Sequence, residues 1–344
     1  MKAVYIEENG GPEVVKVGDL PEPGPPGRGE VRLRVRAAAL NHLDIWVRMG
    51  RPGMAEVRPH VLGSDCCGVV DALGEGVEGL AVGDPVILNP GLHGEDEYTR
   101  RGEQNISPSY GITGAHRQGT FAEFTNVRAD KLLPKPEHLS DAEAAALPLA
   151  HLTAWCMLIR RAQLKAGETV LIHGIGGGAA LAALQIASLA GAEPMVTSSS
   201  HDKLDRSLMH GAAALINYRE DDVVESVMAL TNGRGVDVVF DAVGAATWPI
   251  NMGATRRGGR IVHCGVTTGA EATVNIAQLY WNHLTVMGST MGSDEDFRQM
   301  VAAVSAGVIA PVVDKVFPIE EAAAAQARME AGEQFGKIVL SISE

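Results

Sequence analysis

Four glycines within five residues, Gly174, Gly176, Gly177 and Gly178, are the residues of this sequence whose spacing most clearly suits a chemical task. Glycine adopts positive φ angles and lets backbone N–H groups approach a pyrophosphate closely. Ala179 follows, and a small residue is accepted at this place of a dinucleotide-binding turn. A helix that begins here adds partial positive charge at its N-terminus. The stretch therefore predicts a phosphate-binding turn.

The residues on either side of the glycines have the patterns of a strand and a helix. Residues 169–173 are rich in β-branched and aliphatic side chains, whereas residues 179–192 are dominated by Ala and Leu. Residues 169–192 contain no charged side chain and are long enough to cross a membrane. The four glycines and the change from a strand pattern to a helix pattern favour a buried element of a soluble protein instead. A glycine-rich turn that binds no ligand is the other alternative.

Strand and helix patterns alternate downstream of this turn and predict a doubly wound parallel sheet of the Rossmann type. The expected helices cover residues 202–210 and 222–230, and the expected strands cover 193–197, 214–217, 236–241, 259–265 and 284–289.

Residues 1 to about 150 have a β-rich pattern with frequent turns. Residues 89–119 form a long polar loop, and helical character begins near Ser140, which has the pattern of an N-cap, and continues to Arg161. A final helix at 319–331 precedes a strand at 335–340 that can rejoin the first domain. We therefore expect a discontinuous domain of residues 1–151 and 295–344 around a nucleotide-binding domain of residues 152–294.

Composition and charge exclude several classes of function. The net charge is −13 and no basic cluster is present, so nucleic acid is not expected as a partner. The N-terminus lacks a hydrophobic signal core, so no membrane partner and a cytoplasmic location are expected. Of the four cysteines, Cys66 and Cys67 are adjacent while Cys156 and Cys264 are isolated, a pattern typical of buried thiols rather than a disulfide framework.

The order and spacing of several motifs resemble the medium-chain dehydrogenase/reductase superfamily over essentially the whole chain. The matching motifs are residues 38–44, 63–70, 83–84, 147–154, the glycine turn and 336–340. The resemblance implies an α/β protein with a discontinuous GroES-like β-rich catalytic domain and a Rossmann domain.

Departures from the family pattern indicate which branch the chain resembles. Zinc alcohol dehydrogenases of this superfamily have Cys at the place of Asn41, a His-Glu pair at Ser64-Asp65, and Cys or Asp near Leu149. None of Asn41, Ser64 and Leu149 supplies an imidazole or thiolate. The resemblance is therefore to the zinc-independent, quinone-oxidoreductase-like branch, and no metal is expected. Substitute ligands are the alternative, and the candidates for them are His42, Asp44, His60, Asp65 and His151.

The long polar loop departs from the family in the same way. Relatives with a structural zinc have four cysteines there at the spacing x2, x2, x7, and alignment places His93, Asp96, Thr99 and Ser107 at those positions. Thr and Ser hydroxyls are poor substitutes for thiolates as zinc ligands. We expect a zinc lobe without its metal.

The residue at the end of the second Rossmann strand decides the expected nucleotide. An NAD enzyme of this fold has an acidic residue there, and this chain has Ser198. A 2′-phosphate is then tolerated, and donors or positive charge come from Ser199, Ser200, His201, Lys203 and Arg206. Tyr218 resembles the tyrosine beside the 2′-phosphate in NADPH-dependent relatives. We expect NADP(H), although the serines can also cap the next helix.

The resemblance also implies which residues border the rest of the cofactor. Lys337 would lie near the cofactor, with a surface charge as the alternative. The residues expected beside the nicotinamide are Val243, Gly265, Val266, Thr267, Ser289 and Met291, and Thr153 is also expected to contact the cofactor.

Without zinc, charge developing on a substrate oxygen must be met by hydrogen-bond donors. Asn41 is the first candidate, followed by Ser64 and His151, with Trp46 as an apolar wall. Each can also be purely structural. The expected reaction is NADPH-dependent reduction of a small molecule, a quinone or an α,β-unsaturated carbonyl. Alcohol oxidation or aldehyde reduction, and NADPH binding without catalysis, are the alternatives.

Residues 284–289 resemble the edge strand through which relatives pair. We expect a homodimer or a dimer-based tetramer.

Overall fold

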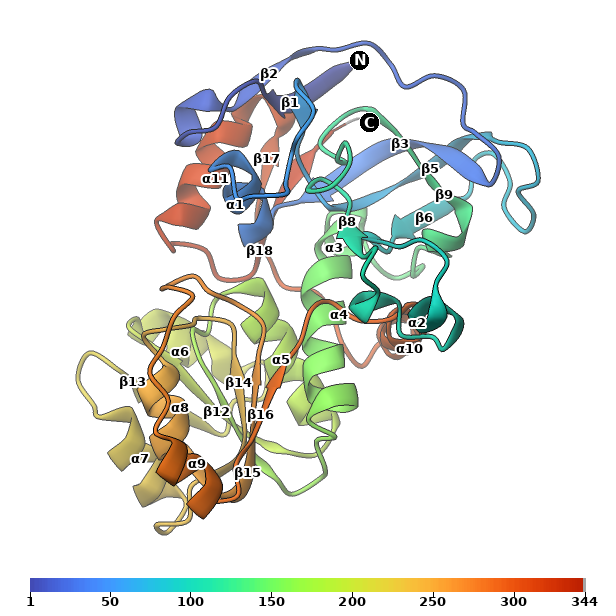
Figure 1. Cartoon of the computed structure of the whole chain (residues 1–344). Coiled ribbons are helices and arrows are strands. Elements are labelled where there is room, and N and C mark those ends of the chain that lie inside the picture. Colours follow the sequence, from blue (N-terminus) through green and yellow to red (C-terminus); the bar gives the residue numbers. More distant parts are fainter. Residues whose placement is uncertain (343–344) are drawn as a thin grey trace. The chain divides into compact units, whose positions relative to one another are not determined.

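The computed structural model describes residues 1–342, which fold into two compact units (Figure 1). The first unit comprises residues 1–150 and 293–342, and the second unit comprises His151–Gly292. The domain limits expected from the sequence lie one residue away at the first junction and two residues away at the second.

The second unit is built on a six-stranded parallel sheet in the order β13-β12-β11-β14-β15-β16. This is the Rossmann strand order, and it confirms the doubly wound fold. The strands are β11 (Thr169–Ile172), β12 (Glu193–Ser198), β13 (Ala214–Asn217), β14 (Val236–Asp241), β15 (Thr255–His263) and β16 (Thr285–Gly288).

Helices of the second unit pack on both faces of this sheet. Apolar residues of α7, α8 and α9 form one core with alternate residues of the strands, and α5 and α6 contact β11, β12 and β13. The helices are α5 (Gly178–Leu189), α6 (His201–Leu208), α7 (Val223–Leu230), α8 (Trp248–Ala254) and α9 (Ile276–Trp281), with a π-helical segment at Cys156–Arg161.

The first unit contains the β-rich part of the chain, in which β18 pairs antiparallel with β3 and so joins the C-terminal segment to the N-terminal one. The main sheet has the order β10-β6-β5-β3-β18-β17, with β9 also paired to β3, and a smaller sheet has the order β2-β1-β4. The strands are β1 (Lys2–Ile6), β2 (Lys16–Asp19), β3 (Glu30–Ala39), β4 (His60–Val61), β5 (Asp65–Leu73), β6 (Pro85–Leu88), β7 (Gly91–Leu92), β8 (Gly111–Ile112), β9 (Phe124–Arg128), β10 (Leu132–Pro134), β17 (Val313–Pro318) and β18 (Lys337–Ser341).

Short helices connect these strands, and the predicted N-cap of α3 is confirmed. Ser140 Oγ accepts a hydrogen bond from Glu143 N at 3.3 Å, and the Glu143 carboxylate accepts one from Ser140 N at 2.9 Å. The helices are α1 (His42–Arg48), α2 (Glu97–Arg100), α3 (Asp141–Ala146), α10 (Asp294–Ser305) and α11 (Ala322–Glu330), and α4 (Pro148–Trp155) crosses the junction between the units. Within residues 1–342, every helix is too short or too polar to cross a membrane.

Candidate functional site

The predicted glycine turn connects β11 to α5 in the second unit. Gly174 and Gly176 have φ angles of +70° and +113°, which L-residues with side chains rarely adopt. Gly177 is the N-cap of α5, so Gly178 and Ala179 begin the helix. Ile175 N donates to Thr197 O at 2.9 Å and fixes the turn against β12. The backbone geometry is that of an anion-binding helix N-terminus.

A second turn, between β14 and α8, lies against the first one. A Cβ added to Gly174 would lie 3.5 Å from Val243 Cγ2, so the Val243 side chain covers the glycine turn. Gly265 follows β15, and a Cβ there would lie only 2.1 Å from Ala242 O. Val243 and Gly265, which the resemblance places beside the cofactor, thus lie at the carboxyl edge of the sheet, where nucleotide ligands of this fold bind.

A buried polar chain connects the two turns, and sequence reasoning missed it. Gly174 N donates to Thr197 Oγ1 at 3.3 Å, and Thr197 Oγ1 lies 3.2 Å from His173 Nδ1. His173 Nε2 lies 2.9 Å from Asn251 Oδ1, and Asn251 Nδ2 donates to Asp241 Oδ2 at 2.5 Å. Because Asn251 Oδ1 only accepts, His173 carries its hydrogen on Nε2 and accepts from Thr197 on Nδ1.

Asp241 is the end point of this chain and organises the β14–α8 turn. Its carboxylate, which is fully buried, accepts hydrogen bonds from Val243 N at 2.6 Å and Thr247 Oγ1 at 2.8 Å. Burial alone would raise the pKa of Asp241, but the neighbouring His263 ring, 3.5 Å away, and the hydrogen bonds from Val243 N and Asn251 hold it below its ordinary value. Burial lowers the pKa of His173 and keeps that ring neutral. The carboxylate therefore stays ionised.

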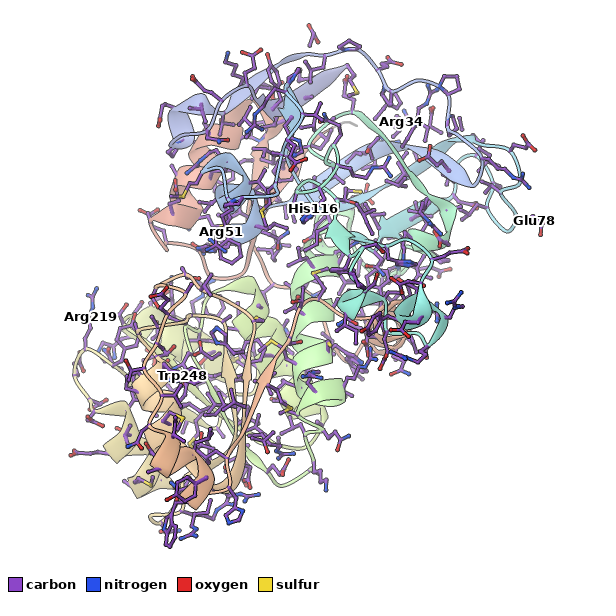
Figure 2. All side chains as sticks on the ribbon, in the orientation of Figure 1. Arg34, Arg51, Glu78, His116, Arg219 and Trp248 are labelled. Atoms are coloured by element: carbon purple, nitrogen blue, oxygen red, sulfur yellow. The ribbon has the colours of Figure 1, made fainter. Side chains whose placement is uncertain are left out.

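The end of β12 carries the residues predicted to select the nucleotide. Ser198 is buried, and its Oγ accepts from Ser200 N at 3.2 Å, while Ser200 Oγ caps α6 by accepting from Lys203 N at 3.4 Å. The capping alternative is therefore present for Ser200. Ser199 and Lys203 are partly exposed, and Tyr218 is half-exposed directly after β13. The side chain of Arg219, labelled in Figure 2, extends from the same loop.

This edge is not uniformly positive. His201 Nε2 lies 2.8 Å from Glu220 Oε1, and its hydrogen bond to this exposed carboxylate raises the pKa of His201. Part of the positive charge expected for a 2′-phosphate is thus already paired.

In the first unit, Asn41 and Lys337 meet around Asp65 in a buried cluster. Asn41 Nδ2 donates to Asp65 Oδ2 at 2.9 Å, and Lys337 Nζ donates to Asn41 Oδ1 at 2.5 Å and to Asp65 Oδ2 at 3.1 Å. Asp65 Oδ1 accepts from Leu149 N at 2.9 Å, in the first turn of α4. The elements α1, β5, β18 and α4 are thus connected through one carboxylate.

Asp44 adjoins this cluster and is almost completely buried. Its two oxygens accept from Asn41 N at 2.7 Å and Gly63 N at 3.2 Å. Burial raises the pKa of Asp44 to about 7 despite these hydrogen bonds. Ser64, also buried, donates from Oγ to Thr113 O at 2.7 Å.

The remaining predicted residues lie in both units. Trp46 is partly exposed, and the Arg51 guanidinium, labelled in Figure 2, stacks over its ring at 4.0 Å. In the second unit, His151 is buried, Thr153 Oγ1 lies 3.6 Å from Met291 Sδ, and Ser289 Oγ lies 3.6 Å from Cys156 Sγ. Val266 and Thr267 follow Gly265, and Thr267 Oγ1 lies 3.4 Å from Ala242 O.

The side chains at the expected zinc positions do not fit a catalytic zinc. Asn41 presents an amide bound to Asp65 and Lys337, Ser64 presents a hydroxyl bound to Thr113 O, and Leu149 has no ligand atom. Among residues 1–342, no three His, Cys, Asp or Glu side chains gather in a way that could hold a metal ion. The five substitute ligands considered from the sequence therefore form no such group.

Three of the four lobe positions are joined by hydrogen bonds. Asp96 caps α2 by accepting from Tyr98 N and Thr99 N, both at 2.9 Å, and Ser107 Oγ donates to the other Asp96 oxygen. Thr99 Oγ1 accepts from Asp96 N at 2.9 Å. Asp96, Thr99 and Ser107 thus keep the lobe closed through their own hydrogen bonds.

His93, the fourth position, belongs to a different cluster, in which only Lys131 is fully buried. Lys131 Nζ donates to His93 Nε2 at 2.7 Å and to the two Asp294 oxygens at 2.6 and 2.7 Å. Since His93 Nε2 accepts, the ring hydrogen is on Nδ1, which donates to Gly94 O at 3.0 Å. The Lys131 ammonium thus connects the lobe to α10.

Comparison with known proteins agrees with this architecture. A model of the alcohol dehydrogenase GroES-like domain matches residues 27–137, and a model of the zinc-binding dehydrogenase family matches residues 178–306. A zinc-type alcohol dehydrogenase-like protein of Schizosaccharomyces pombe is 33% identical over 99% of both chains. The chain belongs to the medium-chain dehydrogenase/reductase superfamily.

Other relatives of this medium-chain oxidoreductase carry different activities in their names. A quinone oxidoreductase of Pseudomonas aeruginosa is 31% identical over 98% of this chain and 99% of its own length, which supports the quinone-oxidoreductase-like branch. The crystal structure of an NAD-dependent alcohol dehydrogenase is 45% identical, with a TM-score of 0.95 and complete coverage of both chains. These relatives share the superfamily, whereas their names give different activities and cofactors.

Proposed function

We propose that this chain is an NADPH-dependent oxidoreductase that transfers a hydride to a quinone or an α,β-unsaturated carbonyl without a catalytic zinc. The observation that carries the proposal is the chemistry of Asn41 and Ser64, whose side chains are bound to Asp65, Lys337 and Thr113 O in a family whose zinc enzymes have metal ligands at these places. Without a Lewis acid, activated acceptors are the accessible substrates.

Each unit contributes a separate part of this activity. When bound, the nicotinamide cofactor supplies the hydride. The N-terminus of α5, with Gly174 and Gly176 at positive φ, would receive the pyrophosphate. The β14–α8 turn, held by Asp241, would fix Val243 beside the cofactor.

The preference for NADPH is supported by the side chain at the end of β12. Ser198 presents no carboxylate to repel a 2′-phosphate, and Lys203 and Tyr218 are accessible nearby. We expect Ser198→Asp to weaken NADPH binding at least about tenfold and to improve NADH binding. Fluorescence titration of both reduced cofactors measures this, with Ser188→Asp, partly exposed on α5, as a control that adds the same charge elsewhere. Equal affinity of the unmodified protein for NADH and NADPH would contradict the assignment.

A direct role for Asn41 in stabilising the substrate oxygen stays a prediction. Its two amide hydrogens are directed at Asp65 Oδ2 and, at 3.5 Å, at Ala39 O. If Asn41 donates directly to the substrate oxygen, we expect Asn41→Leu to lower kcat about 100-fold. If Asn41 acts only within its cluster with Asp65 and Lys337, Asn41→Leu should lower the melting temperature and change kcat less.

The decisive experiment is a substrate panel with NADPH, in which enones, quinones and aldehydes are each tested with and without a metal chelator. We expect turnover of an enone or a quinone at the same rate in both conditions. Turnover confined to aldehydes or alcohols and abolished by the chelator, together with stoichiometric zinc in elemental analysis, would contradict the proposal. Cofactor binding without turnover of any substrate would instead indicate a binding protein.

Alcohol dehydrogenase activity is the second candidate, favoured by the name of the solved structure that shares 45% of the sequence. The same panel with an alcohol and NAD+ distinguishes the two activities.

We also propose that two copies associate through β16, either as a homodimer or within a dimer-based tetramer. This strand is at the edge of the six-stranded sheet and carries the exposed Val286. Ile276, Tyr280 and Trp281 of α9 are each more than 60% exposed. An unpaired apolar edge strand of this kind favours association. Sedimentation velocity at low micromolar concentration should show a dimer or tetramer, and Val286→Lys should yield monomers, whereas a monomeric unmodified protein would contradict the proposal.

A further inference from the structure

Lys337 is a lysine whose ammonium group is almost wholly enclosed by oxygen acceptors. The residue is 4% exposed. Its Nζ donates to Leu40 O at 2.7 Å, Asn41 Oδ1 at 2.5 Å and Asp65 Oδ2 at 3.1 Å. An ammonium has three hydrogens, and here each of them has an acceptor. No ammonium hydrogen is left for an outside partner.

The charges around Lys337 are balanced only when it is positive. Asp65 and Asp44, both at most 1% exposed, are the carboxyl groups beside it, on β5 and α1. Burying an ionised carboxylate without a counterion costs several kcal/mol. His42 also faces this region, but burial, with a smaller contribution from the Lys337 charge, lowers its pKa and keeps it neutral. Lys337 is therefore the cation that compensates Asp65.

The protonation state of Asp44 determines the net charge of the cluster that it forms with Asp65 and Lys337. Because burial raises the pKa of Asp44 to about 7, this group holds a proton through most of the mildly acidic range. The cluster then contains one ammonium, one carboxylate and one neutral acid, and its net charge is zero.

We infer that the Lys337 ammonium is the resident cation of a closed, oxygen-lined site, and that its charge holds Asn41, Asp65 and the start of α4 in place. The chain itself thus supplies the positive charge that organises this part of the unit. This role of Lys337 is separate from the proposed reaction, because the cluster holds its cation whether or not a substrate is reduced. The competing explanation is that the lysine only fills space.

The pH dependence of stability separates these explanations, using Lys337→Met in the full-length protein without cofactor. Methionine keeps most of the volume and removes the charge. The folded variant then contains the Asp65 carboxylate without a cation and regains neutrality by taking up a proton. Since the folded state binds more protons than the unfolded state, the stability of the variant falls as pH rises. We expect a melting temperature about 10 °C below that of the unmodified protein near pH 8.5 and about half that deficit near pH 5.5.

Asp65→Asn should show the opposite dependence. It leaves the ammonium without its carboxylate, so the folded state regains neutrality by releasing a proton, and the deficit shrinks as pH rises. The double variant, Lys337→Met with Asp65→Asn, should melt below the unmodified protein by an amount that does not change with pH. Lys315→Met, on the neighbouring strand β17 and exposed, is the matched control and should change the melting temperature by less than about 2 °C.

The inference would be overturned if Lys337→Met and Asp65→Asn each lowered the melting temperature by the same amount near pH 8.5 as near pH 5.5. If Lys337→Met does not fold, the pH dependence of Asp65→Asn and of the double variant still decides between charge and volume. Because the readout is unfolding without cofactor, this test fails or succeeds independently of the NADPH-dependent reaction.

Discussion

Replacing His173 by phenylalanine tests whether the buried polar chain between the two turns of the second unit has the role that its geometry indicates. The ring of phenylalanine occupies nearly the same volume but has neither nitrogen. Thr197 Oγ1 then loses its acceptor at 3.2 Å, and Asn251 Oδ1 loses its donor at 2.9 Å. Both groups are buried, so water cannot replace the lost partners without a change in packing.

The expected size of the effect follows from these two groups. A buried polar group left unsatisfied costs about 1–3 kcal/mol, so with two such groups the variant should lose about 2–6 kcal/mol in the free energy of unfolding. For a unit of this size, that corresponds to a melting temperature lower by about 5–15 °C. Asn251 is also expected to move, which loosens the Asp241 contacts that hold Val243 N, and NADPH should bind more weakly.

Differential scanning calorimetry with and without NADPH measures both consequences. His138→Phe is the matched control, because His138 is exposed in the other unit and should change the melting temperature by less than about 2 °C. A His173→Phe variant that melts within about 2 °C of the unmodified protein and binds NADPH equally well would refute the reasoning, since the hydrogen bonds would then contribute nothing measurable.

Three further predictions concern single positions. Gly265→Ala places a methyl group 2.1 Å from Ala242 O, so we expect NADPH affinity to fall at least about tenfold in a fluorescence titration. Ser107→Ala removes the donor to Asp96 Oδ2 and should speed proteolysis within residues 89–119, while added zinc should give no protection. Asp44→Asn should become progressively more stable than the unmodified chain as pH rises from about 4 to about 7. Over that range Asp44 ionises in the unfolded chain but keeps its proton in the folded one, because its folded-state pKa is raised, so the unmodified protein loses stability as pH rises. Calorimetry at several pH values measures this difference.

The features that the sequence predicted well are those encoded by neighbouring residues. The glycine turn, the alternating strands and helices of the doubly wound sheet and the Ser140 cap each depend on short local patterns, and the structure confirms them. The returning strand was also predicted, because Lys337 and its neighbours match a family motif. Strand β17 was not predicted, since its apolar residues Val313, Val316 and Phe317 do not follow a period-2 alternation.

The polar chain through His173 was missed for a physical reason. His173 and Asn251 are hydrogen-bonded but lie 78 positions apart in the sequence. Each stands among apolar residues, where a single polar side chain carries no sign of its partner. Only the folded sheet brings the ends of β11, β12 and β14 together and makes these residues one network. The same holds for Lys337, whose partner Asn41 is 296 positions away.

In the lobe at residues 89–119, hydrogen bonds join three of the four residues that stand where the resemblance places zinc ligands. A structural zinc contributes about 10–16 kcal/mol of binding free energy in small zinc domains, whereas each neutral hydrogen bond contributes about 1 kcal/mol. The hydrogen bonds among Asp96, Thr99 and Ser107 are thus too weak to replace a zinc ion by themselves. The ammonium of Lys131, bound to His93 and to Asp294 of α10, provides a second anchor that ties the loop to a helix. Lys131→Met should therefore open the lobe to proteolysis more than Ser107→Ala does, and equal cleavage of the two variants would show that the anchor has no such role.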